Sequence, residues 1–123
     1  MAETIRSHKE LVVWQKAMNL VEAVYRLTET FPQREIYALS AQVRRAVVSV
    51  PSNIAEGRSR HTRKDFVHFL YIAYGSVAER ETQLLIGRRL AFGKQSEYET
   101  CESILSEVSR MLHAMIKKLE ANS

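Results

Sequence analysis

The sequence contains one cysteine, two prolines and four glycines in 123 residues, and each scarcity limits the structures that it can form. A single cysteine cannot form a disulfide within the chain, which fits a reducing compartment. With so few helix-breaking residues, the chain leaves room for long uninterrupted helices. No apolar run approaches the roughly 20 residues that cross a bilayer, and the amino terminus lacks a signal-peptide core. We therefore expect a cytoplasmic protein with no membrane contact.

The composition is typical of one folded domain spanning residues 1–123. Hydrophobic residues make up 46% of the chain and charged residues 26%, a balance that excludes a disordered segment of this length. The net charge is +4, which permits an acidic partner such as nucleic acid without requiring one.

Breaks in the hydrophobic pattern divide the chain into four predicted helices. The first ends before Pro32, because the residue preceding a proline disfavours the α-helical region. Thr62 and Asp65 resemble a capping pair that opens the third helix, and Ser96 with Glu99 resembles a capping box that opens the fourth. The short connections favour antiparallel neighbours, which predicts an all-α, up-down-up-down four-helix bundle. The predicted helices cover residues 9–30, 35–58, 62–90 and 96–120.

The second predicted helix carries Pro51 in its interior. Proline has no backbone N–H and clashes with the carbonyl group four residues earlier, here that of Val47, so we expect helix 2 to kink at Pro51. Folding about the first turn places Trp14 and Gln15 level with Pro51. A side-chain donor from one of these two residues could satisfy the Val47 carbonyl.

The first predicted helix has two apolar stripes where a helix packed on one core needs one. One stripe consists of Leu11, Trp14, Met18, Val21 and Tyr25. A wide core would explain both stripes, but we favour a self-association surface, because a long exposed apolar stripe is a liability on a monomer. We assign the oligomer interface to the other stripe, which includes Val13, Ala17, Leu20, Val24 and Leu27.

Polar residues form a further stripe on the second helix and a counterpart on the third. Folding these helices about their turn brings Arg45 within one helical turn of Glu79, close enough for a charge-assisted hydrogen bond. The pair could be partly buried or could lie in a solvated seam, and the sequence leaves both alternatives open. The predicted polar seam comprises Gln42, Arg45, Asn53, Glu56, Glu79 and Gln83.

The sequence offers little support for catalysis. It has no glycine-rich phosphate loop, no Ser or Cys nucleophile beside a plausible base, and no Glu-x-x-His pair. Cys101 lies on the apolar stripe of the last helix, which predicts a packed thiol. We therefore expect no enzymatic activity, no cofactor, no metal site and no small-molecule substrate.

Basic residues gather at one end of the predicted bundle. The turn between the second and third helices shares an end with the carboxyl terminus, and residues 58–64 contain four Lys or Arg and no acid. Repeated around a symmetric oligomer, this turn would form a basic rim suited to phosphate, although basic turns are also ordinary solvated surface. The predicted nucleic-acid-binding residues are Arg58, Arg60, Arg63, Lys64, Lys117 and Lys118. Arg88, Arg89 and Lys94 at the opposite end are the next candidates.

Several short motifs occur in an order that resembles a known family. They are Val-Trp-Gln-Lys-Ala (13–17), Gln-Val-Arg-Arg (42–45), Val-Pro-Ser-Asn-Ile-Ala-Glu-Gly (50–57), Gly-Ser (75–76) and Glu-Arg-Glu-Thr-Gln-Leu (79–84). Together they resemble the bacterial four-helix-bundle proteins encoded in intervening sequences of 23S ribosomal RNA genes. That family also looks related to the accessory variability determinant of diversity-generating retroelements. Arg80 and Gly87 depart from the pattern, since relatives more often carry an apolar residue and an alanine there.

The resemblance implies a closed bundle that assembles as a homopentamer with no established enzymatic activity. Through the retroelement relatives it also implies a structured RNA or a reverse transcriptase as partner. The sequence thus predicts a non-catalytic, oligomeric RNA-binding accessory or scaffold protein. A scaffold that binds only other proteins is the alternative.

Overall fold

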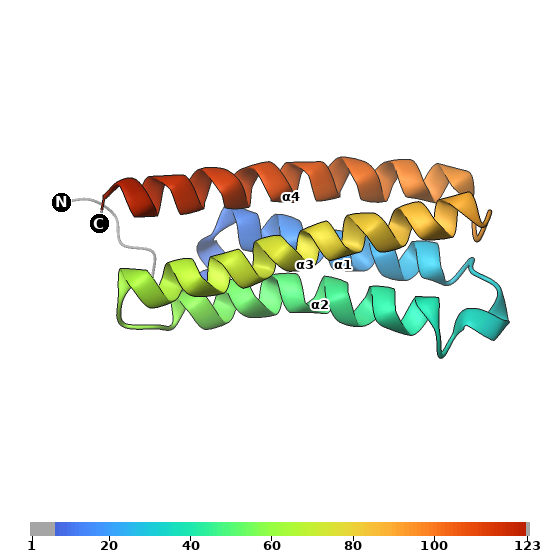
Figure 1. Ribbon diagram of the computed structural model, residues 1–123, viewed down its shortest axis with the longest axis horizontal. Helices are drawn as coiled ribbons and strands as arrows, with labels where there is room; N and C mark the ends of the chain where they lie inside the picture. The colour runs from blue at the N-terminus through green and yellow to red at the C-terminus, as the bar shows by residue number, and fades with distance from the viewer. Residues whose placement is uncertain (1–6, 123) are drawn as a thin grey trace.

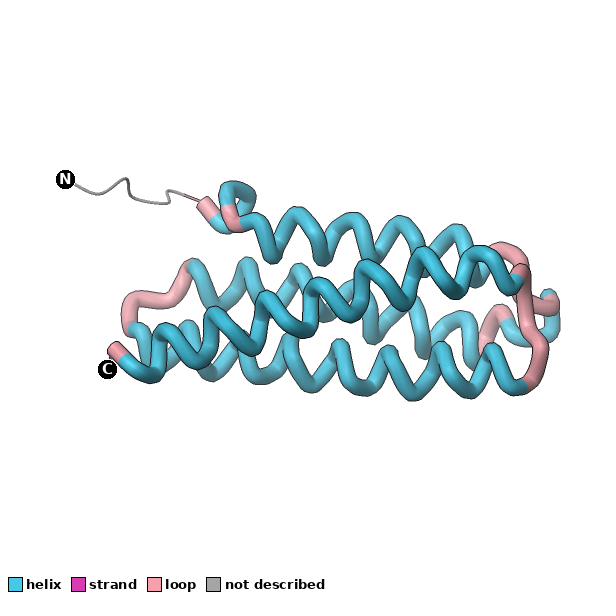
Figure 2. Tube along the Cα trace, turned by 90° about the horizontal axis from the view of Figure 1, so that it is seen from above, coloured by secondary structure: helices cyan, strands magenta, loops and turns pink. Residues whose placement is uncertain are grey.

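The computed structural model describes residues 7–122, which form four α-helices and two short 3-10 turns with no strand in that range. The helices are α1 (Val12–Thr28), α2 (Leu39–Arg58), α3 (Arg63–Arg89) and α4 (Gln95–Ala121), and the turns are η1 (His8–Glu10) and η2 (Gln33–Glu35). Successive helices run in opposite directions along one long axis (Figures 1 and 2). Each helix packs on two neighbours, so that α1 and α3 both contact α2 and α4. The predicted all-α fold with four helices is confirmed.

The first two helices begin later than the sequence predicts. The Ser7 side chain accepts the N–H of Lys9 at 3.1 Å and caps η1. The chain is then extended at Leu11, with φ −75° and ψ 126°, so that α1 begins at Val12. In the same way η2 precedes α2, which begins at Leu39. Short hydrogen-bonded turns thus replace the first turn that periodicity alone assigns to each helix.

The starts of α3 and α4 depend on different contacts. Thr62 Oγ1 accepts the N–H of Asp65 at 3.1 Å, which confirms the predicted capping pair. The capping box predicted for α4 is wrong, because Ser96 lies inside the helix and follows its first residue. The residue before α4 is instead fixed by a contact with the segment that follows α1. The backbone N–H of Lys94 donates to Thr30 Oγ1 at 3.0 Å.

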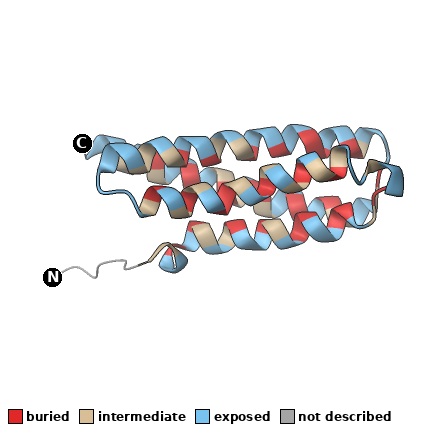
Figure 3. Cartoon of the chain, turned by 90° about the horizontal axis from the view of Figure 1, so that it is seen from below, coloured by how far each residue is buried: buried red, intermediate tan, exposed pale blue. Residues whose placement is uncertain are grey.

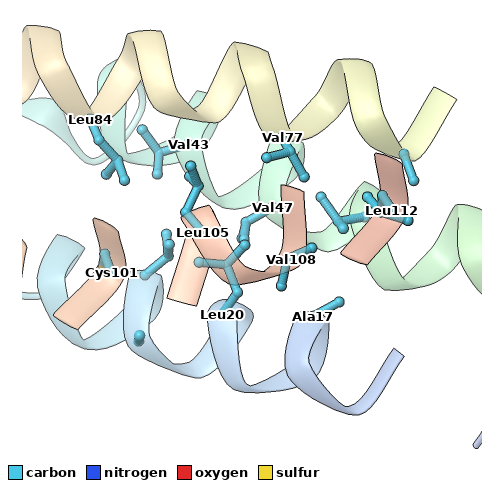
Figure 4. Packing of buried hydrophobic residues seen from close by; sticks show 14 of the residues in the cluster. Ala17, Leu20, Val43, Val47, Val77, Leu84, Cys101, Leu105, Val108 and Leu112 are labelled. Carbon is cyan, nitrogen blue, oxygen red and sulfur yellow. The ribbon is translucent and has the colours of Figure 1, made fainter. Parts of the chain in front are cut away.

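One apolar stripe from each helix faces the interior and forms the core (Figure 3). Ala17 and Leu20 of α1 point into the same interior space as Val47 and Val108 (Figure 4). The α1 stripe that the sequence assigned to an oligomer interface belongs to this core. That assignment is wrong, because side chains enclosed by their own chain present no surface to another copy. The residues concerned are at most 2% exposed and comprise Val13, Ala17, Leu20, Val24 and Leu27.

The other stripe of α1 is divided between core and surface, and its first residue, Leu11, is buried. Met18 is 38% exposed and Tyr25 is 39% exposed, while Trp14 and Val21 are half-buried. Trp14, Met18 and Val21 border a shallow apolar groove whose other wall includes Val48 of α2. The two predicted stripes therefore exist, but the stripe with exposed apolar side chains is not the one that the sequence analysis assigns to the oligomer interface.

Helix α2 contains Pro51 as a buried interior residue. Trp14 borders the same groove as Pro51, as the folding argument predicts. The amide of Gln15 donates instead to the carbonyl of Lys9 at 2.9 Å, so it does not serve the Val47 carbonyl. The kink at Pro51 remains a prediction.

Helices α2 and α3 approach closely at Gly57. A Cβ atom there would lie 2.8 Å from Cβ of Phe69 and 3.0 Å from the ring of Phe66. By contrast, a Cβ atom at Gly75 of α3 would meet nothing within 4 Å. The missing side chain of Gly57 therefore lets α3 lie against the end of α2.

We expect Gly57→Ala to lower the free energy of unfolding by about 1–3 kcal/mol, because the two helices must separate to admit the methyl group. Gly75→Ala is the matched control, and alanine's better helix propensity should raise stability by about 0.5–1 kcal/mol. Chemical denaturation measures both changes. A Gly57→Ala variant as stable as the wild type would contradict the close approach.

Candidate nucleic-acid interface and polar groove

The α2–α3 turn and the carboxyl end of α4 lie at the same end of the bundle (Figure 1). The Arg63 guanidinium donates to the backbone carbonyl of Asn122, directly after α4. Arg63 and Lys64 also border a small cavity with Leu119 and Glu120 of α4. The structure thus brings the basic residues of the turn next to the segment that carries Lys117 and Lys118, as the sequence predicts.

Two arginines of the turn are already engaged within the chain or shielded by it. Nη2 of Arg60 lies 2.8 Å from Oε2 of Glu56, and its guanidinium lies 4.8 Å from the centroid of the Phe69 ring. Arg58 is half-buried. Arg63, Lys64, Lys117 and Lys118 are exposed and form no ion pair among the described residues, and we call the end that carries them the basic end.

The opposite end also carries basic residues, but its arginines make more contacts within the chain. Nη1 of Arg88 lies 2.7 Å from both carboxylate oxygens of Glu102, and this hydrogen bond raises the pKa of Arg88. The Arg44 guanidinium stacks over the Tyr25 ring at 4.7 Å. Of the three alternative candidates at this end, Arg89 and Lys94 are exposed and Arg88 is half-buried in an ion pair.

The polar seam between α2 and α3 is hydrogen-bonded at its centre and open at one end. The hydroxyl oxygens of Ser49 and Ser76 lie 2.6 Å apart, and Nδ2 of Asn53 donates to the Ser49 carbonyl at 2.7 Å. Arg45 and Glu79 are both exposed, and among the described residues no ion pair joins them. The solvated alternative therefore describes this end of the seam.

We expect a double-mutant cycle of Arg45→Ala and Glu79→Ala to give a coupling energy below about 1 kcal/mol, as for separated charges in water. Thermal or chemical denaturation of the four proteins supplies the cycle. A coupling of several kcal/mol would show that the two side chains form a shielded pair.

Arg80 is a charged residue inside the core. It is 0% exposed, and its Nη1 and Nη2 atoms donate to Oε1 of Gln83 at 2.6 and 2.7 Å. Its Nε atom has no hydrogen-bond partner in the described part of the chain. Burial lowers the pKa of Arg80 to about 10, so the group still carries its charge at neutral pH.

In the sequence, Arg80 stood out only as a departure from a family pattern, and its burial was not predicted. A signal was present, because the neighbouring core positions of α3 are Ala73, Val77, Leu84 and Gly87. Residue 80 completes their spacing of three and four, which is the spacing of a buried helical face. Spacing therefore indicates burial of residue 80, although a charged side chain is rarely found fully buried.

We expect Gln83→Leu to lower the free energy of unfolding by about 3–5 kcal/mol, because it leaves a buried charge without its acceptor. Arg80→Met should leave stability unchanged or raise it by about 1–4 kcal/mol, since an apolar side chain then fills the site. The double variant Arg80→Met and Gln83→Leu should regain most of the free energy of unfolding that Gln83→Leu alone loses. Chemical denaturation measures these changes. If both single variants lose the same free energy of unfolding, the buried charge of Arg80 is not unfavourable and the prediction is wrong.

Cys101 is buried, as predicted, and burial raises the pKa of its thiol to about 12. A thiol with such a pKa is almost entirely protonated at neutral pH and is a poor nucleophile. Within residues 7–122 no group of three or more His, Cys, Asp or Glu side chains is placed to hold a metal ion. No helix in the same range is both long and apolar enough to cross a membrane.

These features define a four-helix-bundle protein with a basic end and a polar groove between α2 and α3. The chain belongs to the 23S rRNA-intervening sequence protein family, whose model matches residues 9–114. The resemblance drawn from the sequence motifs is thereby confirmed.

Among solved structures, the fold is similar to a crystal structure from Bacteroides thetaiotaomicron, described as a protein with unknown function from the S23 ribosomal protein family. The TM-score is 0.79 and the sequence identity is 25%, with 86% of this chain and 96% of that chain covered. No curated protein matches the chain.

Proposed function

We propose that this protein is a non-catalytic, oligomeric accessory or scaffold protein that binds RNA through the basic end of its bundle. The observation that carries this proposal is the convergence of Arg63 and Lys64 on α3 with Lys117 and Lys118 on α4 at one end of the molecule. Four exposed cations from two distant segments can contact one phosphate backbone together. The family's description, which names a 23S rRNA intervening sequence, supports RNA as the acidic partner.

Binding of this kind depends on shape and charge more than on base sequence. Lysine side chains act as flexible point charges, and phosphate contacts carry no sequence information directly. The amino terminus of α3 adds a partial positive charge to the same surface. A reverse transcriptase is a further partner, expected from the resemblance alone.

A closed homo-oligomer, a pentamer according to the resemblance, would repeat the basic end around a symmetry axis. With the core stripe of α1 excluded, we assign self-association to the apolar groove between α1 and α2. Exposed apolar side chains on both walls of the groove, Met18 and Val48, support this assignment. The same groove favours the alternative function, a scaffold that binds only proteins.

We expect the double variant Met18→Glu and Val48→Glu to dissociate the assembly, because it places charges in an apolar contact. Ile72→Glu is the control, since Ile72 of α3 is as exposed as Val48 and lies outside the groove. Light scattering measures the mass, and circular dichroism checks that the helices persist. A wild-type mass of one chain at micromolar concentration would exclude the oligomer.

We expect neutralising Arg63, Lys64, Lys117 and Lys118 with glutamine to weaken binding to different structured RNAs about equally. The slope of log affinity against log salt should flatten by about 0.7 to 0.9 for each phosphate that the variant no longer neutralises. Gel-shift titration at several salt concentrations measures both effects, and the free energy of unfolding should change little.

The matched control removes four charges elsewhere, by changing Arg26, Arg34, Arg89 and Lys94 to glutamine. It should retain most of the affinity and the wild-type salt slope. If both variants lose affinity equally, binding follows net charge and not the basic end. Wild-type protein that binds no RNA at low salt would favour the protein scaffold.

A further inference from the structure

The open end of the seam between α2 and α3 is a polar groove with a volume of about 440 Å³. Its walls carry two amide side chains, one guanidinium, one hydroxyl and one carboxylate, so that most of its polar groups can donate hydrogen bonds. The lining residues are Gln42, Arg45, Ala46, Ser49, Glu79 and Gln83.

Gln83 connects this groove with the buried charge of Arg80. Its Oε1 atom accepts hydrogen bonds from both Nη1 and Nη2 of Arg80. Because a guanidinium has only donors, the amide atom that faces it must be the oxygen. The amide nitrogen Nε2, with its two N–H groups, is therefore the atom that Gln83 offers to the groove.

The charges around the groove favour an anion. Arg45 on the rim and Arg80 beneath Gln83 supply two positive charges, and Glu79 supplies one negative charge. Among the described residues no carboxylate lies within 4 Å of Arg80, and its Nε atom is unpaired. A buried charge acts through a medium of low polarity, so an anion in the groove would be stabilised by Arg80 through the polarised Gln83 amide.

We propose that the groove between α2 and α3 binds a carboxylate, held by Nε2 of Gln83 and the guanidinium of Arg45. Arg80 acts as the buried charge that orients Gln83. A single negative charge suits the site better than a phosphate dianion, because Glu79 on the rim repels the second charge. A planar carboxylate also matches the fork of a guanidinium. This proposal is independent of RNA binding at the basic end.

Nuclear magnetic resonance of the full-length, isotope-labelled protein tests the site with sodium acetate as the probe. The side-chain NH₂ signals of Gln83 should shift and saturate with acetate, and sodium chloride at equal ionic strength should not reproduce the shift. Arg45→Gln should weaken acetate binding about tenfold, the effect of losing one charge-assisted hydrogen bond. Arg80→Met should also weaken it, because the Gln83 amide loses the charge that orients it. The control is Arg89, an exposed arginine on α3, the helix that also carries Arg80. Arg89→Gln should bind acetate like the wild type.

Equal shifts with chloride, tighter binding of inorganic phosphate than of acetate, or unchanged binding in Arg45→Gln would each overturn the proposal. Light scattering in acetate then distinguishes two sources of the natural carboxylate. If it comes from a second copy of this chain, acetate competes with assembly and lowers the mass. If it comes from a free organic acid, acetate binds and the mass stays constant.

Discussion

The close packing of α2 against α3 is the constraint on which the other features of this molecule depend. It requires the absent side chain of Gly57, against which Phe66 and Phe69 lie, and it brings the Ser49 and Ser76 hydroxyls to 2.6 Å. Two helices held this closely fix the position of their connecting turn relative to α4. Between them also lies a polar groove lined by Gln83, the hydrogen-bond acceptor of Arg80. Both proposed sites are therefore consequences of one helix–helix contact.

The structure retains features that cost stability, and each coincides with a proposed function. A buried guanidinium whose hydrogen-bond acceptor is the amide of Gln83 is less favourable than an apolar side chain in the same space. An apolar groove that includes Met18 and Val48 is unfavourable on a monomer in water. The first cost is offset if an anion enters the α2–α3 groove, and the second if another copy covers the α1–α2 groove.

Much of the fold can be predicted from local sequence patterns. Which side of a helix faces the core, and whether a given residue is buried, cannot. Helix number, helix order and the Thr62 cap depend on spacing and capping chemistry within a few residues. Periodicity identified both apolar stripes of α1, but it does not tell which stripe faces the core when both are apolar. The start of α4 agrees with the prediction to within one residue, but the predicted capping box is wrong, because the flank of α4 is held by Thr30, which is far away in the sequence. For Arg80, residue type argued against burial while its spacing argued for it, and only packing of the whole bundle decides between them.

The central claim is that RNA contacts the end of the bundle formed by the α2–α3 turn and the carboxyl end of α4. Ultraviolet crosslinking of the wild-type protein to a structured RNA, followed by mass spectrometry of the peptides, tests it most directly. We expect crosslinks within residues 58–71 and 117–122, where the Phe69 ring lies against the Arg60 guanidinium and Phe66 and Tyr71 are close by in the sequence. Crosslinks confined to residues 25–45 and 88–98 would place the RNA at the opposite end and contradict the account.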